Sequence, residues 1–186
     1  EILSSFMART WRRPVAEQEV DELYSIYADS RKTTTFVNAL KDCLVQVLVS
    51  ADFLYLVERK DLSGKREKLS PFELSNRLSY FLWSSMPDER LFELAAKGEI
   101  ASAEILRAEV SRMLKDERSW NFVEQFTSQW LDLDRMNTIA VSPEIYPDFN
   151  EDLKSDMRHE TLHFFANIIR DDMSALNFID SDFSFL

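Results

Sequence analysis

Two histidines and a glutamate in this chain stand at the spacing that zinc hydrolases use. Residues His159-Glu160-Thr161-Leu162-His163 read H-E-x-x-H, and these histidines are the only two in the sequence. On a helix, this spacing places two imidazoles one turn apart, where they bind zinc while the glutamate polarises the attacking water. Taken alone, the motif indicates a zinc-dependent hydrolase with His159 and His163 as ligands and Glu160 as general base.

The residues around the motif favour a different interpretation, an exposed helix face. Apolar residues recur at helical spacing and define the expected buried side: Leu153, Met157, Thr161, Phe164, Phe165 and Ile168. Both histidines lie on the opposite side. A third protein ligand would have to come from outside this sequence or from one of four later aspartates: Asp171, Asp172, Asp180 and Asp182. We therefore predict exposed histidines without structural zinc, and keep the zinc-dependent hydrolase as the alternative function.

Other carboxylates have both a structural and a chemical interpretation. Asp180 and Asp182 are spaced like two oxygen ligands of a calcium loop, but the glycine and distal glutamate of an EF-hand are missing. We interpret them as a helix-capping or surface pair. Glu160 sits at the edge of the apolar stripe, where a buried pair with an arginine such as Arg77 is favoured over general-base duty.

Arg77, Trp83 and Asp88 form the most distinctive group of residues in the sequence. In a functional interpretation, these three residues would form the edge of a ligand-binding site. The structural interpretation, which we favour, has Trp83 filling the core between two capped helices while Arg77 and Asp88 clamp the turn. Aromatic residues at helical spacing usually belong to a core, which also disfavours a sugar-binding platform.

The charge distribution disfavours several partners. The net charge is −11, and it is concentrated beyond residue 93, where 9 basic and 18 acidic side chains remain of the 22 and 33 in the whole chain. Phosphate backbones require clustered Lys and Arg, so nucleic-acid binding is disfavoured, as is binding to anionic membranes. No apolar run approaches the roughly 20 residues that cross a bilayer, so no membrane insertion is expected.

Cys43 is the only cysteine, which excludes an internal disulfide, a thiolate zinc cluster and a C-x-x-C-H haem attachment within this sequence. With two glycines and five prolines, the composition favours long helices over turn-rich sheets. We expect both termini to be cuts from a longer protein, because the chain begins at Glu1 and ends in apolar residues.

Periodicity and capping signals predict an all-α fold, an antiparallel, bundle-like array of about eight helices with negligible strand. Six of the expected helices cover residues 2–11, 17–28, 71–83, 103–115, 122–133 and 150–170. A long apolar helix is expected after Thr33–Thr35, reaching Val57, and another helix is expected to end at Gly98. A short turn is expected after Ser174. Ser70 and Ser85 are both predicted as N-caps. We expect an N-terminal helical segment at 1–59, a linker at 60–69 and a C-terminal helical domain at 70–186.

Five sequence blocks resemble two adjoining domains of unknown function in large planctomycete-type proteins that carry cytochrome c domains. These blocks are Thr10-Trp-Arg-Arg-Pro14, Leu48-Val-Ser-Ala-Asp-Phe-Leu-Tyr55, Arg77-Leu-Ser-Tyr-Phe-Leu-Trp-Ser-Ser-Met-Pro-Asp88, Met113-Leu-Lys-Asp116 and Gln129-Trp-Leu131. The resemblance covers nearly the whole chain, and its third block is long enough to be specific.

The resemblance implies a context more than a mechanism. Such parent proteins are exported and multidomain, and a separate domain carries the covalent haem c, so no cofactor is expected in this chain itself. The chain would then be a non-catalytic helical scaffold or interaction module in the periplasm or outside the cell. Its partners would be the other domains of the parent protein.

Overall fold

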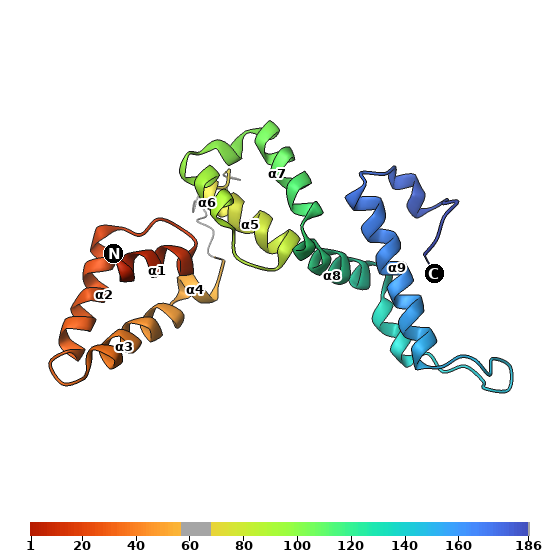
Figure 1. Cartoon of the computed structure of the whole chain (residues 1–186), viewed down its shortest axis with the longest axis horizontal. Coiled ribbons are helices and arrows are strands. Elements are labelled where there is room, and N and C mark those ends of the chain that lie inside the picture. Colours follow the sequence, from red (N-terminus) through yellow and green to blue (C-terminus); the bar gives the residue numbers. More distant parts are fainter. Residues whose placement is uncertain (57–67, 186) are drawn as a thin grey trace, which may run out of the picture. The chain divides into compact units, whose positions relative to one another are not determined.

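The computed structural model describes residues 1–56 and 68–185 of the chain (Figure 1). These residues form nine α-helices and four short 3₁₀ helices, without strands, so the predicted all-α fold is confirmed. They divide into two compact units, Glu1–Leu78 with Met86–Ser102 and Ser79–Ser85 with Ala103–Leu186. The expected linker at 60–69 lies largely outside the described residues, and that boundary stays a prediction. No described helix combines the length and apolarity that crossing a bilayer requires.

The first unit contains α1 to α4, the start of α5, α6 and one 3₁₀ helix. Their bounds are α1 Ile2–Trp11, α2 Glu17–Ser30, α3 Phe36–Leu48, α4 Ala51–Leu54, α5 Pro71–Trp83, α6 Glu89–Ala96 and η1 Glu99–Ala101. A buried cluster joins α1, α2 and α3 through Met7, Leu23, Cys43 and Val47. Burying these apolar side chains stabilises the three helices against one another, because each alone would leave its stripe in water.

The prediction of one long apolar helix after Thr35 is wrong, because the helix breaks at Ser50. Helix α3 ends at Leu48, and α4 begins at Ala51. The Ser50 hydroxyl donates a hydrogen bond to the Val47 carbonyl at 2.7 Å and accepts one from the Trp11 indole at 2.8 Å. A serine that bonds locally competes with the helical ladder, and here a distant indole fixes that conformation. The expected continuation past Leu54 is also wrong, because Tyr55 adopts an extended backbone and Leu56 is not helical, while Val57 lies outside the described residues.

The two predicted serine caps have different outcomes. Ser70 forms the expected capping box, since its hydroxyl accepts from the Glu73 amide at 3.2 Å and Glu73 accepts from the Ser70 amide at 2.8 Å. The prediction that Ser85 is an N-cap is wrong. Asp88 caps α6 instead, since its side chain accepts a hydrogen bond from the Leu91 amide at 3.0 Å. A cap at Ser85 would require a helical residue directly before proline, which sterically disfavours that conformation.

The second unit contains the end of α5 and the helices that follow residue 102. These are α7 Ala103–Lys115, η2 Glu117–Ser119, α8 Trp120–Leu131, η3 Leu133–Thr138, α9 Glu151–Arg170 and η4 Ala175–Phe178. Its core cluster comprises buried residues from α8, η3 and α9: Val123, Leu133, Leu162, Phe165 and Ala166. Phe165 also packs against the rings of Phe126 and Phe178, with centroids 5.6 and 5.2 Å apart.

Only part of the buried face predicted for α9 is correct. Phe165 and Ile168 are buried, whereas Leu153 and Met157 are 39% and 42% exposed. The core cluster takes its α9 members from the second half of the helix, so the first two turns extend beyond it. Leu162, which the periodicity did not assign to this face, is buried in that core.

Candidate functional site

Helix α9 carries the H-E-x-x-H residues on a regular and well-capped stretch. The Asn150 side chain accepts a hydrogen bond from the Leu153 amide at 2.9 Å, and Glu151 and Asp152 occupy the first turn, where acidic charge favours the helix dipole. His159 and His163 therefore lie one turn apart. Both are exposed, which confirms the prediction about their position; the prediction that they hold no structural zinc remains untested.

The three motif side chains meet three different neighbours. The Nδ1 atom of His159 lies 3.3 Å from the Ser155 hydroxyl, which is on the same helix. The ring of His163 lies between those of Trp120 and Phe185, with centroids 5.0 and 6.3 Å away. Glu160 accepts a hydrogen bond from the Ser184 hydroxyl. The carboxylate that would act as general base is thus engaged by the C-terminal segment. The expected pair of Glu160 with Arg77 stays a prediction.

The later aspartates do not complete a metal site among the described residues. All four candidates are exposed: Asp171, Asp172, Asp180 and Asp182. Within residues 1–56 and 68–185, no group of three or more His, Cys, Asp or Glu side chains is placed to hold a metal ion. Between the two aspartates of the calcium-like pair, Ser181 hydrogen-bonds the backbone of Phe183 at 3.2 and 3.3 Å, which makes this segment a local turn.

Trp83 is completely buried in the second unit. Its indole N–H donates a hydrogen bond to the Met113 carbonyl at 3.0 Å. The backbone carbonyl of Trp83 accepts a hydrogen bond from the Asn121 side chain at 2.9 Å. The Arg118 guanidinium lies 3.5 Å from the ring centroid, and that of Arg112 lies 5.3 Å away. Both contacts are cation–π interactions, which gain strength when the partners are shielded from water.

Two carboxylates hold these arginines in place. Glu109, with a side chain only 1% exposed, accepts from Arg112 at 2.7 Å. Asp116 accepts two hydrogen bonds from Arg118, at 2.8 and 2.7 Å. The side-chain hydrogen bond from Arg118 lowers the pKa of Asp116 to about 2. We call Trp83, Glu109, Arg112, Asp116 and Arg118 the Trp83 cluster.

The predicted grouping of Trp83 with Arg77 and Asp88 stays a prediction, and within the second unit the Trp83 ring contacts Arg112 and Arg118. Asp88 belongs to the first unit, where it caps α6, and Arg77 is an exposed residue of α5. Neither Arg112 nor Arg118 was singled out. A signal was present in Glu109, which stands between Ile105 and Met113 at helical spacing, because a carboxylate within an apolar stripe requires a buried cation.

The Trp-Arg-Arg block forms a second polar arrangement, in the first unit. Arg12 is 6% exposed and donates through one terminal nitrogen to the carbonyls of Asp52, Phe53 and Tyr55. The neighbouring Arg13 pairs with Asp52 at 3.0 Å and Glu19 at 2.8 Å. These bonds tie the end of α1 to α4 and satisfy carbonyls at the end of a short helix.

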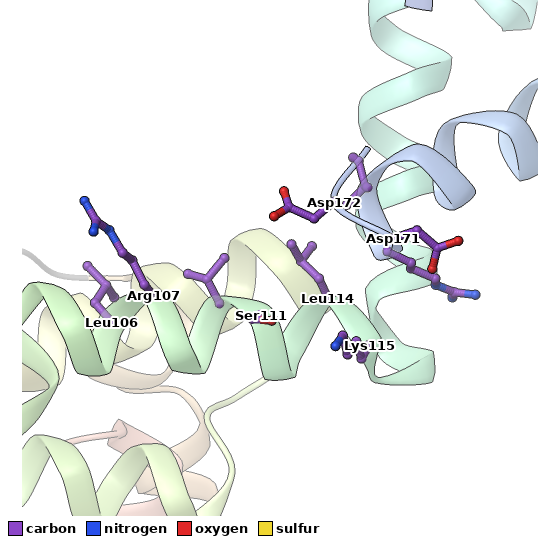
Figure 2. A pocket seen from close by; sticks show the side chains of 10 residues that line it. Leu106, Arg107, Ser111, Leu114, Lys115, Asp171 and Asp172 are labelled. Carbon is purple, nitrogen blue, oxygen red and sulfur yellow. The ribbon is translucent and has the colours of Figure 1, made fainter. Parts of the chain in front are cut away.

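An open groove of about 790 Å³ lies in the second unit, between α7 and the end of α9 (Figure 2). Helix α7 contributes two adjacent rows at intervals of four residues: Leu106, Val110 and Leu114 in the first, and Arg107, Ser111 and Lys115 in the second. Across from them lie Ile169, Arg170, Asp171 and Asp172. The groove therefore has an apolar floor and charged edges.

Fold and sites together define a class: an all-α protein of two helical units whose buried polar groups organise packing. Residues 69–186 match the family described as PSD4, protein of unknown function (DUF1592), and the chain belongs to that family. Residues 1–58 match PSD5, a protein of unknown function (DUF1595). No curated protein and no solved structure matches the chain significantly.

Proposed function

We propose that the chain is a non-catalytic helical scaffold or interaction module of a larger, exported, cytochrome-c-associated protein, in which it positions other domains. The observation that carries the proposal is the uncovered apolar side of α3. The resemblance to planctomycete-type proteins supports the parent context and a periplasmic or extracellular location.

Helix α3 carries exposed apolar residues in addition to its buried stripe. Of its thirteen residues, nine are apolar, and three of these are buried: Ala39, Cys43 and Val47. On its other side and just past its end lie four exposed apolar residues, which we call the α3 face: Val37, Val45, Leu48 and Val49, which are 56, 55, 40 and 60% exposed. The polar residues Asn38 and Lys41 lie among them. An exposed group of apolar residues marks a candidate interaction site.

The Arg12 bonds hold a rigid edge beside this face. They fix the backbone of α4 and of the residue that follows it, from Asp52 to Tyr55. In this stretch Leu54 is 58% exposed and Tyr55 is 66% exposed. A preorganised apolar surface loses less conformational entropy on binding than a mobile one. The same arginine that stabilises the first unit thus supports its use as a docking surface.

Haem c does not fit the residues of this chain, and we place it on a separate domain of the parent. Covalent attachment requires the C-x-x-C-H pattern, but the sequence has one cysteine. Cys43 is fully buried and faces the Leu23 carbonyl at 3.7 Å. Burial raises the pKa of its thiol and so disfavours the reactive thiolate.

The alternative, a zinc-dependent hydrolase, is supported by the continuous helix that holds His159 and His163 one turn apart. Its general base would have to be Glu160, whose carboxylate is engaged by Ser184. Metal analysis of the dialysed protein separates the two functions, since stoichiometric zinc lost on His159→Ala favours the hydrolase.

The scaffold proposal is tested by placing charges on the α3 face. We expect Val45→Asp with Leu48→Asp to weaken binding to the parent protein's other domains about tenfold or more, measured by isothermal titration calorimetry, because the carboxylates require water. The matched control, Ser25→Asp with Gln46→Asp, adds the same charge at exposed polar positions and should leave affinity unchanged. Equal affinity for both double variants would reject the α3 face as the interface.

A further inference from the structure

The groove between α7 and the end of α9 has charged side chains that the fold does not use. Within the described part of the chain, the side chains of Arg107, Lys115, Asp171 and Asp172 form no ion pair and no hydrogen bond. In Figure 2, the Asp172 carboxylate points into the space between α7 and the end of α9. The Nε atom of Arg170, beside these aspartates, is buried without a hydrogen-bond partner. A ligand can therefore bind these groups without breaking hydrogen bonds or ion pairs within the described part of the protein.

The apolar floor has the dimensions of a helix docking site. Leu106, Val110 and Leu114 form a row over eight residue steps, about 12 Å at the rise of an α-helix, and Ile169 faces them. The second row, with Arg107 and Lys115, runs parallel to the first and is exposed. An amphipathic helix presents apolar anchors at matching intervals of three and four residues, with its polar flanks toward the edges.

We propose that this groove binds an amphipathic helix of a partner protein. The apolar side of that helix covers Val110 and its row. Acidic residues on one flank meet Arg107 and Lys115, and basic residues on the other flank meet Asp172, whose carboxylate points toward α7 (Figure 2). The surface lies in the second unit and shares no residue with the α3 face, so it extends the function beyond the scaffold role and does not depend on it.

The same features argue against other occupants. Small-molecule sites usually enclose most of the ligand surface, whereas this groove is only partly enclosed. A nucleic acid would meet two aspartates in a part of the chain that is already acidic. A helix with one acidic and one basic flank satisfies both edges at once, and charge complementarity of this kind determines which partner is accepted.

The test uses three stapled helical peptides of about 18 residues, long enough to hold a helix when constrained. All share one apolar side. The first peptide has one acidic and one basic flank, the second has two acidic flanks and the third has two basic flanks. Fluorescence anisotropy with the full chain should show the tightest binding for the first peptide. Equal affinity for all three peptides, or binding of none, would overturn the proposal.

Charge reversal in the groove sharpens the test. We expect Arg107→Glu with Lys115→Glu to weaken binding of the first peptide about tenfold and to make the doubly basic peptide the best ligand, because both edges are then acidic. The control, Arg9→Glu with Lys41→Glu, makes the same change in net charge at exposed positions of the first unit and should leave the preference unchanged. An equal loss in the control would show that net charge, not the groove, governs binding and would reject the proposal.

The acidic edge is tested separately by Asp172→Asn. Asp172 has a positive φ of 51°, a conformation that asparagine also tolerates, so this change removes charge with little effect on the backbone. We expect Asp172→Asn to weaken binding of the first peptide a few-fold. Binding of the doubly acidic peptide should not become weaker. The α3 variants should retain peptide affinity, which distinguishes failure here from failure of the scaffold proposal. Self-association through this groove, seen by sedimentation without peptide binding, would also reject the proposal.

Discussion

The Trp83 cluster and the H-E-x-x-H residues of α9 both lie in the second unit, yet their surroundings differ. In the Trp83 cluster, the Glu109 side chain is 1% exposed and bonded to Arg112. On α9, His159 and His163 are exposed and have separate neighbours. A buried charge needs fixed partners, whereas an exposed side chain can exchange its partner for water. We therefore expect the H-E-x-x-H residues to tolerate substitution and the Trp83 cluster not to tolerate it.

The largest expected effect is that of Trp83→Ala, which should lower the free energy of unfolding by about 3–5 kcal/mol. The change removes a fully buried indole, its bond to the Met113 carbonyl and the ring surface under Arg118. Urea denaturation followed by circular dichroism measures the loss. Phe81→Ala on the same helix is the control: its ring is 59% exposed, and its loss should be about 1 kcal/mol. Equal losses would contradict the importance of burial.

Glu109→Gln probes the charge without changing the shape of the side chain. We expect a loss of about 2 kcal/mol in unfolding free energy, because the new side-chain amide keeps a hydrogen bond to Arg112 but the fully buried position loses its charged pairing with that guanidinium. Glu104→Gln, at an exposed position of the same helix, should change stability by less than about 0.5 kcal/mol. If the two variants are equally stable, the buried ion pair contributes nothing.

Local signals in the sequence predicted most of the helices, and contacts from distant residues account for the errors. The Asn150 cap and the Ser70 capping box lie within three residues of the amides that they satisfy, so the sequence alone suffices to find them. The break at Ser50 depends on the indole of Trp11, which is 39 residues earlier. No window around Ser50 contains that information.

The sites show the same limit. Periodicity identified an apolar stripe on α9 but not how much of it the rest of the unit covers, so Leu153 and Met157 were assigned to the core and are exposed. Exposure of the histidines was predictable, since it follows from their angle around the same helix. The partners of Trp83 were not, because Arg112 and Arg118 reach its ring only after α5 and α7 pack together.

A smaller effect is expected from pH at the edge of the Trp83 cluster. The hydrogen bond from Arg118 holds the pKa of Asp116 at about 2, below its ordinary value in an unfolded chain. Such a carboxyl stabilises the fold above its unfolded pKa, and this stabilisation is lost as the pH falls toward 2. Asp116→Asn should therefore cost about 1 kcal/mol at pH 6, because the partly exposed pair is screened, and almost nothing near pH 2. A difference that persists at pH 2 would exclude this ion pair as its cause.

The smallest effects belong to the motif that looks most catalytic. We expect His159→Ala to change the unfolding free energy by less than about 0.5 kcal/mol, since its ring is exposed and its Nδ1 atom lies beside the hydroxyl of Ser155 on the same helix. His163→Ala should lower the unfolding free energy slightly more, because that ring packs against Trp120.

Dialysed protein should hold no stoichiometric zinc, because a tight site needs three protein ligands and further partners that orient each imidazole. Two histidines four residues apart still chelate zinc weakly at high concentration. Zinc retained at one equivalent and lost in His159→Ala would show that the H-E-x-x-H residues form a metal site. Glu160→Gln would then be the next variant to assay for hydrolysis.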